Sequence, residues 1–165
     1  MIIATLLASA QLTSSPDLGK AAGACRTNET RPSLVVEVAG LRDRKGLLKL
    51  ELYPDNDADF LADDNALVAA GKAFARVEAP VPATGPVHLC IRAPRAGTYA
   101  VSLLHDRDAD RKFGLSVDGI GFTGNPKLRW AKPAAASARV AIGAGPTPAR
   151  IVLNYRHGLF TFRPD

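Results

Sequence analysis

Hydrophobic and polar residues alternate in short runs between residues 33 and 155, with turn-forming residues between the runs. The clearest run is 47–53, in which Leu48, Leu50 and Leu52 take one face while Lys49 and Glu51 take the other. A period of two is that of a half-buried β-strand. Alternating or continuous apolar runs predict six more strands, at 33–39, 73–81, 87–92, 98–104, 139–142 and 149–155.

These patterns predict an all-β protein of about seven strands. No long amphipathic helix and no repeat of solenoid length interrupts them, and 14 glycines and 12 prolines supply the turns. Seven short antiparallel strands favour a single immunoglobulin-like β-sandwich over residues 33–157, with a small barrel as the alternative. The polar segment ending at Gly46 predicts a hairpin between 33–39 and 47–53.

The flanking segments predict processing and flexibility. The apolar N-terminus ends in Ala8-Ser9-Ala10, which is typical of a signal peptide with its cleavage site, so we expect residues 1–10 to direct export to the periplasm or the medium. The alternative is an N-terminal tail. Residues 11–32 are predicted to be a flexible linker and 158–165 a C-terminal tail, and no run is long enough to predict a transmembrane segment.

The two cysteines, Cys25 and Cys90, fit an exported protein. An even count in an oxidising compartment predicts one disulfide that ties the segment before the first strand to a strand in the middle of the domain. Two unpaired thiols are the alternative.

The net charge of +5 does not indicate nucleic-acid binding. The arginines and lysines are scattered, usually beside acidic residues, and form no basic helix with interleaved aromatic residues. We therefore expect no nucleic-acid partner.

The loop after the 98–104 strand, His105–Lys112, carries the most unusual chemistry. Asp106, Asp108 and Asp110 occupy alternate positions, the spacing of the first three ligands in a Ca²⁺ loop. The helix-loop-helix Ca²⁺ template then fails, because Arg111 takes its glycine position and its terminal carboxylate falls on Val117, one residue before Asp118.

Two other interpretations of this loop stay open. The aspartates can cap backbone N–H groups in a polar turn, with Arg107, Arg111 and Lys112 neutralising their charge. The loop can also bind a polar ligand or a partner. His105 beside Asp106 offers half of an acid–base pair, but neighbouring strand residues point to opposite faces, so we assign no catalytic residue.

The loop and the segment that follows it resemble a known family. The residues are His105-Asp106-x-Asp108-x-Asp110-Arg111-Lys112-Phe113, then Asp118-Gly119-Ile120-Gly121-Phe122 and Asn125. Together with Val38–Leu41 and Gly97-x-Tyr99-Ala100, they resemble the bacterial domain-of-unknown-function 2141 family over about residues 33–155. The resemblance implies an exported sandwich of immunoglobulin or transthyretin type and no particular activity. One departure is Arg111, where the family usually has glycine.

The leading functional hypothesis is an exported, non-enzymatic module at the bacterial cell envelope. It would bind an envelope protein or a small polar ligand through the loops of 105–125, with His105, Asp106, Asp108, Asp110, Asp118 and Asn125 as candidate binding residues. The first alternative is a Ca²⁺-stabilised structural domain with Asp106, Asp108 and Asp110 as the metal ligands. The second is a hydrolase that uses His105 and Asp106.

Overall fold

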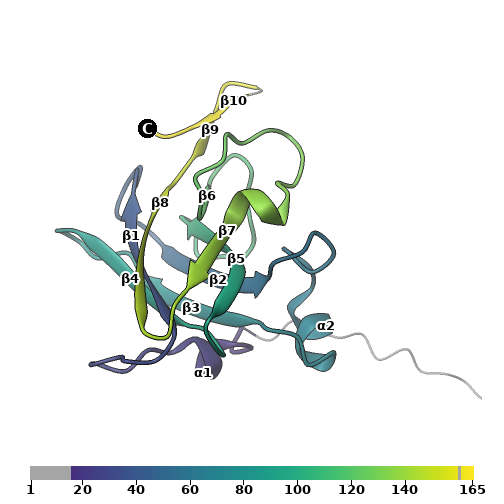
Figure 1. The fold of residues 1–165 in the computed structure, drawn as a ribbon. Coiled ribbons are helices and arrows are strands. Elements are labelled where there is room, and N and C mark those ends of the chain that lie inside the picture. The colour runs from purple at the N-terminus through teal and green to yellow at the C-terminus, as the bar shows by residue number, and fades with distance from the viewer. Residues whose placement is uncertain (1–15, 160) are drawn as a thin grey trace, which may run out of the picture.

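A computed structural model describes residues 16–159 and 161–165, and the predicted signal peptide, residues 1–10, lies outside them. The described chain forms two packed β-sheets and a separate two-stranded sheet of its last two strands (Figure 1), which confirms the all-β sandwich. Its elements are α1 (Lys20–Gly23), β1 (Ser33–Ala39), β2 (Leu47–Pro54), α2 (Asp64–Ala69), β3 (Ala75–Pro80), β4 (Val87–Arg92), β5 (Gly97–Asp106), β6 (Gly119–Phe122), the 3₁₀-helix η1 (Ala135–Ala138), β7 (Arg139–Ile142), β8 (Pro146–Val152), β9 (Tyr155–His157) and β10 (Thr161–Arg163).

The smaller sheet has the order β4-β1-β8, with β1 antiparallel to β4 and parallel to β8. The larger sheet has the order β3-β2-β5, and the outer edge of β5 is shared by two short strands. β7 pairs with its first half, from Gly97 to Ala100, and β6 with its second half, from Ser102 to His105. Strand β5 therefore runs the length of the sandwich and connects its two ends.

The main core lies between the two sheets. The predicted inward faces are correct, since Leu48, Leu50 and Leu52 of β2 are all 0% exposed and pack with Leu34 and Ile151 of the other sheet. Burying such side chains is the dominant stabilising term, at roughly 1.5–3 kcal/mol each. A second cluster around Tyr53, Phe60, Phe74 and Phe122 is covered by the 55–74 segment and η1.

The number of strands differs from the sequence prediction. The described residues contain ten strands rather than about seven, the additional ones being β6, β9 and β10. Strand β6 was hidden because Gly119 and Gly121 resemble turn residues. A Cβ on Gly121 would lie 2.6 Å from Ile151 Cγ2 and 2.7 Å from the Val152 carbonyl oxygen, so close approach to β8 requires glycine there.

The predicted hairpin between 33–39 and 47–53 is wrong. β1 and β2 belong to different sheets, and β1 instead lies between β4 and β8. The strand is hydrogen-bonded at both edges, and its Leu34, Val36 and Val38 face the core while Glu37 is exposed, so the strand is buried on one face. The chain therefore crosses between layers after Ala39.

The disulfide is present between Cys25 and Cys90, which are 65 positions apart. It attaches the segment before β1 to β4, beside a bridge between Ala24 and Ile91. Helix α1 and this attachment lie within the stretch predicted to be a linker, and β10 lies within the predicted tail.

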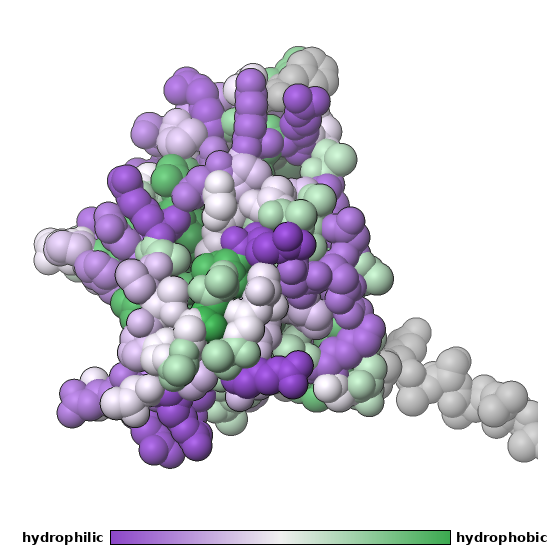
Figure 2. Space-filling model, in the orientation of Figure 1, coloured by the Kyte–Doolittle hydropathy of each residue, from purple (hydrophilic) through white to green (hydrophobic). Residues whose placement is uncertain are grey.

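Hydrophilic side chains cover most of the face in Figure 2 and leave a small apolar area near its centre. Among the described residues, no helix has the length and apolarity needed to span a bilayer.

Candidate cation site in the loop after strand β5

His105, the last but one residue of β5, is locked into the core. Its side chain is 0% exposed, with Nδ1 2.6 Å from the Tyr155 hydroxyl and Nε2 2.8 Å from the Lys45 carbonyl oxygen. A carbonyl only accepts, so Nε2 carries the proton and Nδ1 accepts from the tyrosine hydroxyl. That hydroxyl in turn accepts from the Arg42 backbone N–H. Burial lowers the pKa of His105, so the ring is neutral and fixes the end of β5.

Asp106 ends β5, and the loop of residues 107–118 returns the chain to β6. Aspartate side chains shape this loop by accepting from its backbone. Asp118 accepts from Arg107 N at 2.8 Å and from Gly114 N at 2.7 Å, one bond to each carboxylate oxygen. Asp106 Oδ2 accepts from Arg111 N at 2.8 Å. The turn-capping interpretation therefore describes part of the geometry.

The loop brings four carboxylates together. Asp106, Asp108, Asp110 and Asp118 each offer an oxygen, and these oxygens all lie within 4.8 Å of one another. Asp106 and Asp118 are each 1% exposed, while Asp108 and Asp110 face solvent. The three metal ligands expected from sequence thus gain a fourth, Asp118, because the loop folds back at Gly114 and returns it beside Asp106.

Asp106 is the least satisfied member of this group. Its Oδ1 is buried and has no hydrogen-bond partner, whereas its Oδ2 has one. Burial raises the pKa of Asp106, and the charges of Asp118 and Asp108 raise it further. A buried carboxylate oxygen without a hydrogen-bond partner costs free energy, so a cation or a proton at Asp106 Oδ1 would be stabilising.

The neighbouring basic residues do not neutralise the group, contrary to the sequence interpretation. The Arg107 guanidinium pairs with Asp43, with Nε 3.0 Å from Oδ2, and donates to the Val117 carbonyl oxygen. Arg111 pairs with Glu78 at 3.4 Å. Among the described residues, no side-chain nitrogen of an arginine or lysine lies within 4.0 Å of the four carboxylates' oxygens. Their negative charge is therefore uncompensated by direct ion pairs.

Arg111 takes a backbone conformation that favours glycine. Its φ is +67°, in the left-handed region that costs a side-chain-bearing residue roughly 1–2 kcal/mol. This agrees with the glycine expected at this position from the resemblance. The turn forms with arginine there, at a cost in backbone strain.

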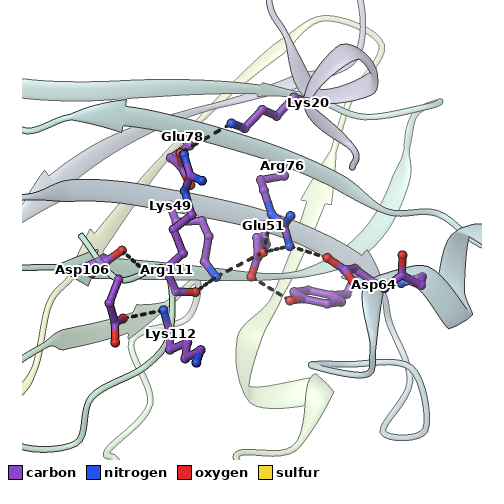
Figure 3. A network of polar contacts seen from close by, with 12 residues as sticks. Lys20, Lys49, Glu51, Asp64, Arg76, Glu78, Asp106, Arg111 and Lys112 are labelled. Carbon is purple, nitrogen blue, oxygen red and sulfur yellow. Dashed lines mark hydrogen bonds and ion pairs between the residues drawn. The ribbon is translucent and has the colours of Figure 1, made fainter. Parts of the chain in front are cut away.

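The loop rests on the outer face of the larger sheet (Figure 3). Arg111 lies between Glu78 of β3 and Lys49 of β2, whose Nζ is 3.5 Å from the Arg111 carbonyl oxygen. The polar contacts continue from Lys49 to Glu51, which is 7% exposed. These contacts attach the loop to β2 and β3.

From Glu51 the network reaches helix α2. Arg76 Nη2 lies 2.7 Å from both Glu51 Oε1 and Asp64 Oδ2, and the Tyr53 hydroxyl donates to Glu51 Oε2 at 2.8 Å. Sequence reasoning missed this buried group, because Glu51 and Arg76 occupy the polar positions of alternating strands. Only their coverage by α2 and the 55–74 segment buries them.

Asn125, the last candidate binding residue, has a different role. Its side chain donates to the Arg150 carbonyl oxygen at 2.9 Å and accepts from Val152 N at 2.7 Å. With φ at +47°, it forms the turn after β6 and ties that turn to β8. The structure therefore brings together Asp106, Asp108, Asp110 and Asp118, and keeps His105 and Asn125 in structural bonds.

Comparison with known proteins gives a family and no activity. The sequence profile of a family described as uncharacterized protein conserved in bacteria (DUF2141) matches residues 36–150. No curated protein and no solved structure matches the chain. The match covers most of the sandwich, including the whole aspartate loop, and agrees with the resemblance in residues 105–125. The chain belongs to the DUF2141 family of uncharacterized proteins conserved in bacteria.

Proposed function

We propose that this protein is an exported domain that binds Ca²⁺ through Asp106, Asp108, Asp110 and Asp118. The observation that carries the proposal is the buried Asp106 Oδ1, which has no hydrogen-bond partner and belongs to a group of four converging carboxylates. A bound divalent ion would give this oxygen a partner and offset the mutual repulsion of the carboxylates.

The number of carboxylates favours Ca²⁺ over Mg²⁺. Mg²⁺ usually keeps several waters and takes one or two carboxylates, whereas Ca²⁺ takes 6–8 oxygens, often from several carboxylates. The four oxygens all lie within 4.8 Å of one another, a limit that fits ligands around one Ca²⁺ ion. The mixture of two buried and two exposed carboxylates also suits the variable coordination of Ca²⁺.

The bound ion would give the domain a binding surface at one end of the sandwich. Ca²⁺ takes 6–8 oxygens, so four single carboxylate ligands leave about two to four positions for water, backbone or a partner's oxygen. An acidic group on an envelope protein or a small polar ligand could complete the shell. This connects the cation site with the envelope-binding role expected from the loop.

Calorimetry with and without Ca²⁺ tests the proposal. We expect affinity in the range of extracellular Ca²⁺ modules, a Kd of about 10⁻⁴–10⁻³ M. At 100 times the Kd, the ion stabilises the fold by about 2.7 kcal/mol. For a domain of 165 residues, this corresponds to a rise of about 5–10 °C in Tm. EGTA should abolish the rise.

The variant D108N/D110N removes the negative charge of the two exposed ligands without disturbing the buried pair, and so weakens the attraction for the ion. We expect it to fold and to lose most of the Ca²⁺-dependent rise in Tm. The control, D17N/E37Q, removes the same charge from surface positions outside the loop and should keep the full rise. A wild-type Tm that ignores Ca²⁺ but increases at lower pH would contradict the proposal, because a shared proton would then satisfy Asp106.

Export is proposed on the disulfide and on the N-terminal sequence. A disulfide between Cys25 and Cys90 is typical of an oxidising compartment. Fractionation of the bacterium after rapid alkylation of free thiols tests this. We expect the protein in the periplasm or the medium with no thiol alkylated, whereas a cytoplasmic, fully alkylated protein would refute export.

A further inference from the structure

A large cleft lies at the end of the sandwich opposite the aspartate loop. Its volume is about 920 Å³, and it is bordered by the start of β5 at Gly97–Tyr99, whose far end carries Asp106. The ends of β2 and β4 and the start of β3 complete its walls. A volume of this size is at the upper end of the range of small-molecule sites.

The charges that line the cleft are mostly positive. Four basic residues face two acidic ones, Asp55 and Asp59. Two of the basic residues already have partners: Lys72 pairs with Asp59, and Arg92 lies 2.7 Å from Glu29. The remaining two, Arg31 and Arg95, are exposed and make no ion pair within the described part of the chain.

The strand register places these two arginines close in the fold. Ser33 of β1 pairs with Arg92 of β4, and Ala93 N donates to the Pro32 carbonyl oxygen at 2.9 Å. Arg31 and Arg95 therefore extend from neighbouring strand ends on one wall of the cleft. Two guanidinium groups on one wall form a site for a carboxylate or phosphate, which arginine binds with paired N–H groups.

Asp55 adds a negative charge to the same lining. Its Oδ2 is 2.7 Å from Arg139 Nε, and its Oδ1 is buried without a hydrogen-bond partner within the described residues. Because that oxygen is buried, a ligand in the cleft does not reach it, and the two exposed arginines are the groups that a ligand contacts.

We propose that this cleft binds a small anion, whose carboxylate or phosphate is held by Arg31 and Arg95. Acidic sugars are suitable probes, because each carries one such group on a small ring that fits a cleft of this volume. The site is separate from the aspartate loop and needs no cation. The domain would then bind the anion at the start of β5 and the cation at the end of the same strand.

Three related probes test the chemistry by NMR titration of the ¹⁵N-labelled protein: glucose, glucuronate and glucose 6-phosphate. We expect glucuronate, glucose 6-phosphate or both to shift the amides of residues 92–99, and glucose to shift none. The stronger of the two anions identifies carboxylate or phosphate as the natural group. Shifts of equal size with glucose, or none with either anion, would overturn the proposal.

The variant R31Q/R95Q should weaken anion binding by about tenfold or more, since two charge-assisted contacts are lost. Both residues are exposed, so the fold should be preserved, which the NMR spectrum itself verifies. The control R150Q/R163Q removes the same charge elsewhere and should bind as the wild type does. Unchanged binding by R31Q/R95Q would refute the assignment. All titrations run in buffer freed of divalent ions by a chelating resin, because soluble EGTA is itself a polycarboxylate; failure of the Ca²⁺ proposal then does not affect the outcome.

Discussion

Removing the disulfide should cost this domain a large part of its stability. The change is C25S/C90S, which keeps the side-chain size and removes only the bond. The two cysteines are 65 positions apart, and closing a loop of that length removes about 14 cal/mol/K of entropy from the unfolded chain. At 25 °C this corresponds to about 4 kcal/mol.

The folded state should change little in the variant. The segment around Cys25 keeps its bridge from Ala24 to Ile91, its bond from Arg76 N to the Gly19 carbonyl oxygen at 3.1 Å, and the pair of Glu29 with Arg92. The loss of stability should therefore arise mainly in the unfolded chain. We expect Tm to fall by about 8–16 °C, from the usual relation for domains of this size.

Urea unfolding followed by circular dichroism measures the effect. The wild type in reducing agent is the matched control and should unfold at the same urea concentration as C25S/C90S. Linear extrapolation then gives the difference in unfolding free energy from oxidised protein. A difference under about 1 kcal/mol would refute the reasoning, because the bond would then not restrict the unfolded chain.

Three further predictions concern charged residues. The Arg92 guanidinium and nearby backbone N–H groups lower the pKa of Glu29 to about 2. The stability that the ionised Glu29 contributes is therefore present above about pH 4.5 and lost as the pH falls through 2. In urea unfolding, the difference in stability between wild type and E29Q should shrink over that interval, and a constant difference would contradict the prediction. R76M removes the guanidinium that bridges the buried carboxylates of Glu51 and Asp64 and should destabilise by about 3–5 kcal/mol in urea unfolding, whereas a loss within about 0.5 kcal/mol would mean the network is solvated. R111G relieves a left-handed φ and should raise the unfolding free energy by about 1 kcal/mol, and a decrease would show that the pair with Glu78 matters more.

The local pattern of the chain was sufficient to predict much of the fold. Alternation alone assigned the buried faces of β2 and β4, where Leu50 and Leu89 face the core while Lys49 and His88 do not. It succeeds because the side-chain period of a strand is a local property of the backbone. Cysteine parity similarly predicted the disulfide, since only one intramolecular pairing of two cysteines exists.

The local pattern could not predict which sheet each strand belongs to. The chain changes sheet between β1 and β2, and the parallel pairing of β1 with β8 joins segments over 100 positions apart. Nothing within either strand encodes its partner. Strand β6 could not be predicted from its own sequence either, because Gly121 is explained only by its contact with Ile151 and Val152.

For the candidate site, the sequence by itself determined that Asp106, Asp108 and Asp110 share a loop that follows a strand. Only the tertiary structure decided that Asp118 returns to them, that Arg107 and Arg111 turn to Asp43 and Glu78, and that one oxygen of Asp106 is buried without a partner. Burial and pairing depend on which distant strands cover a residue, and hydrogen bonding reaches only about 3 Å. The spacing of residues along the chain therefore names candidate ligands, while the packing of the sheets decides whether their charges remain uncompensated.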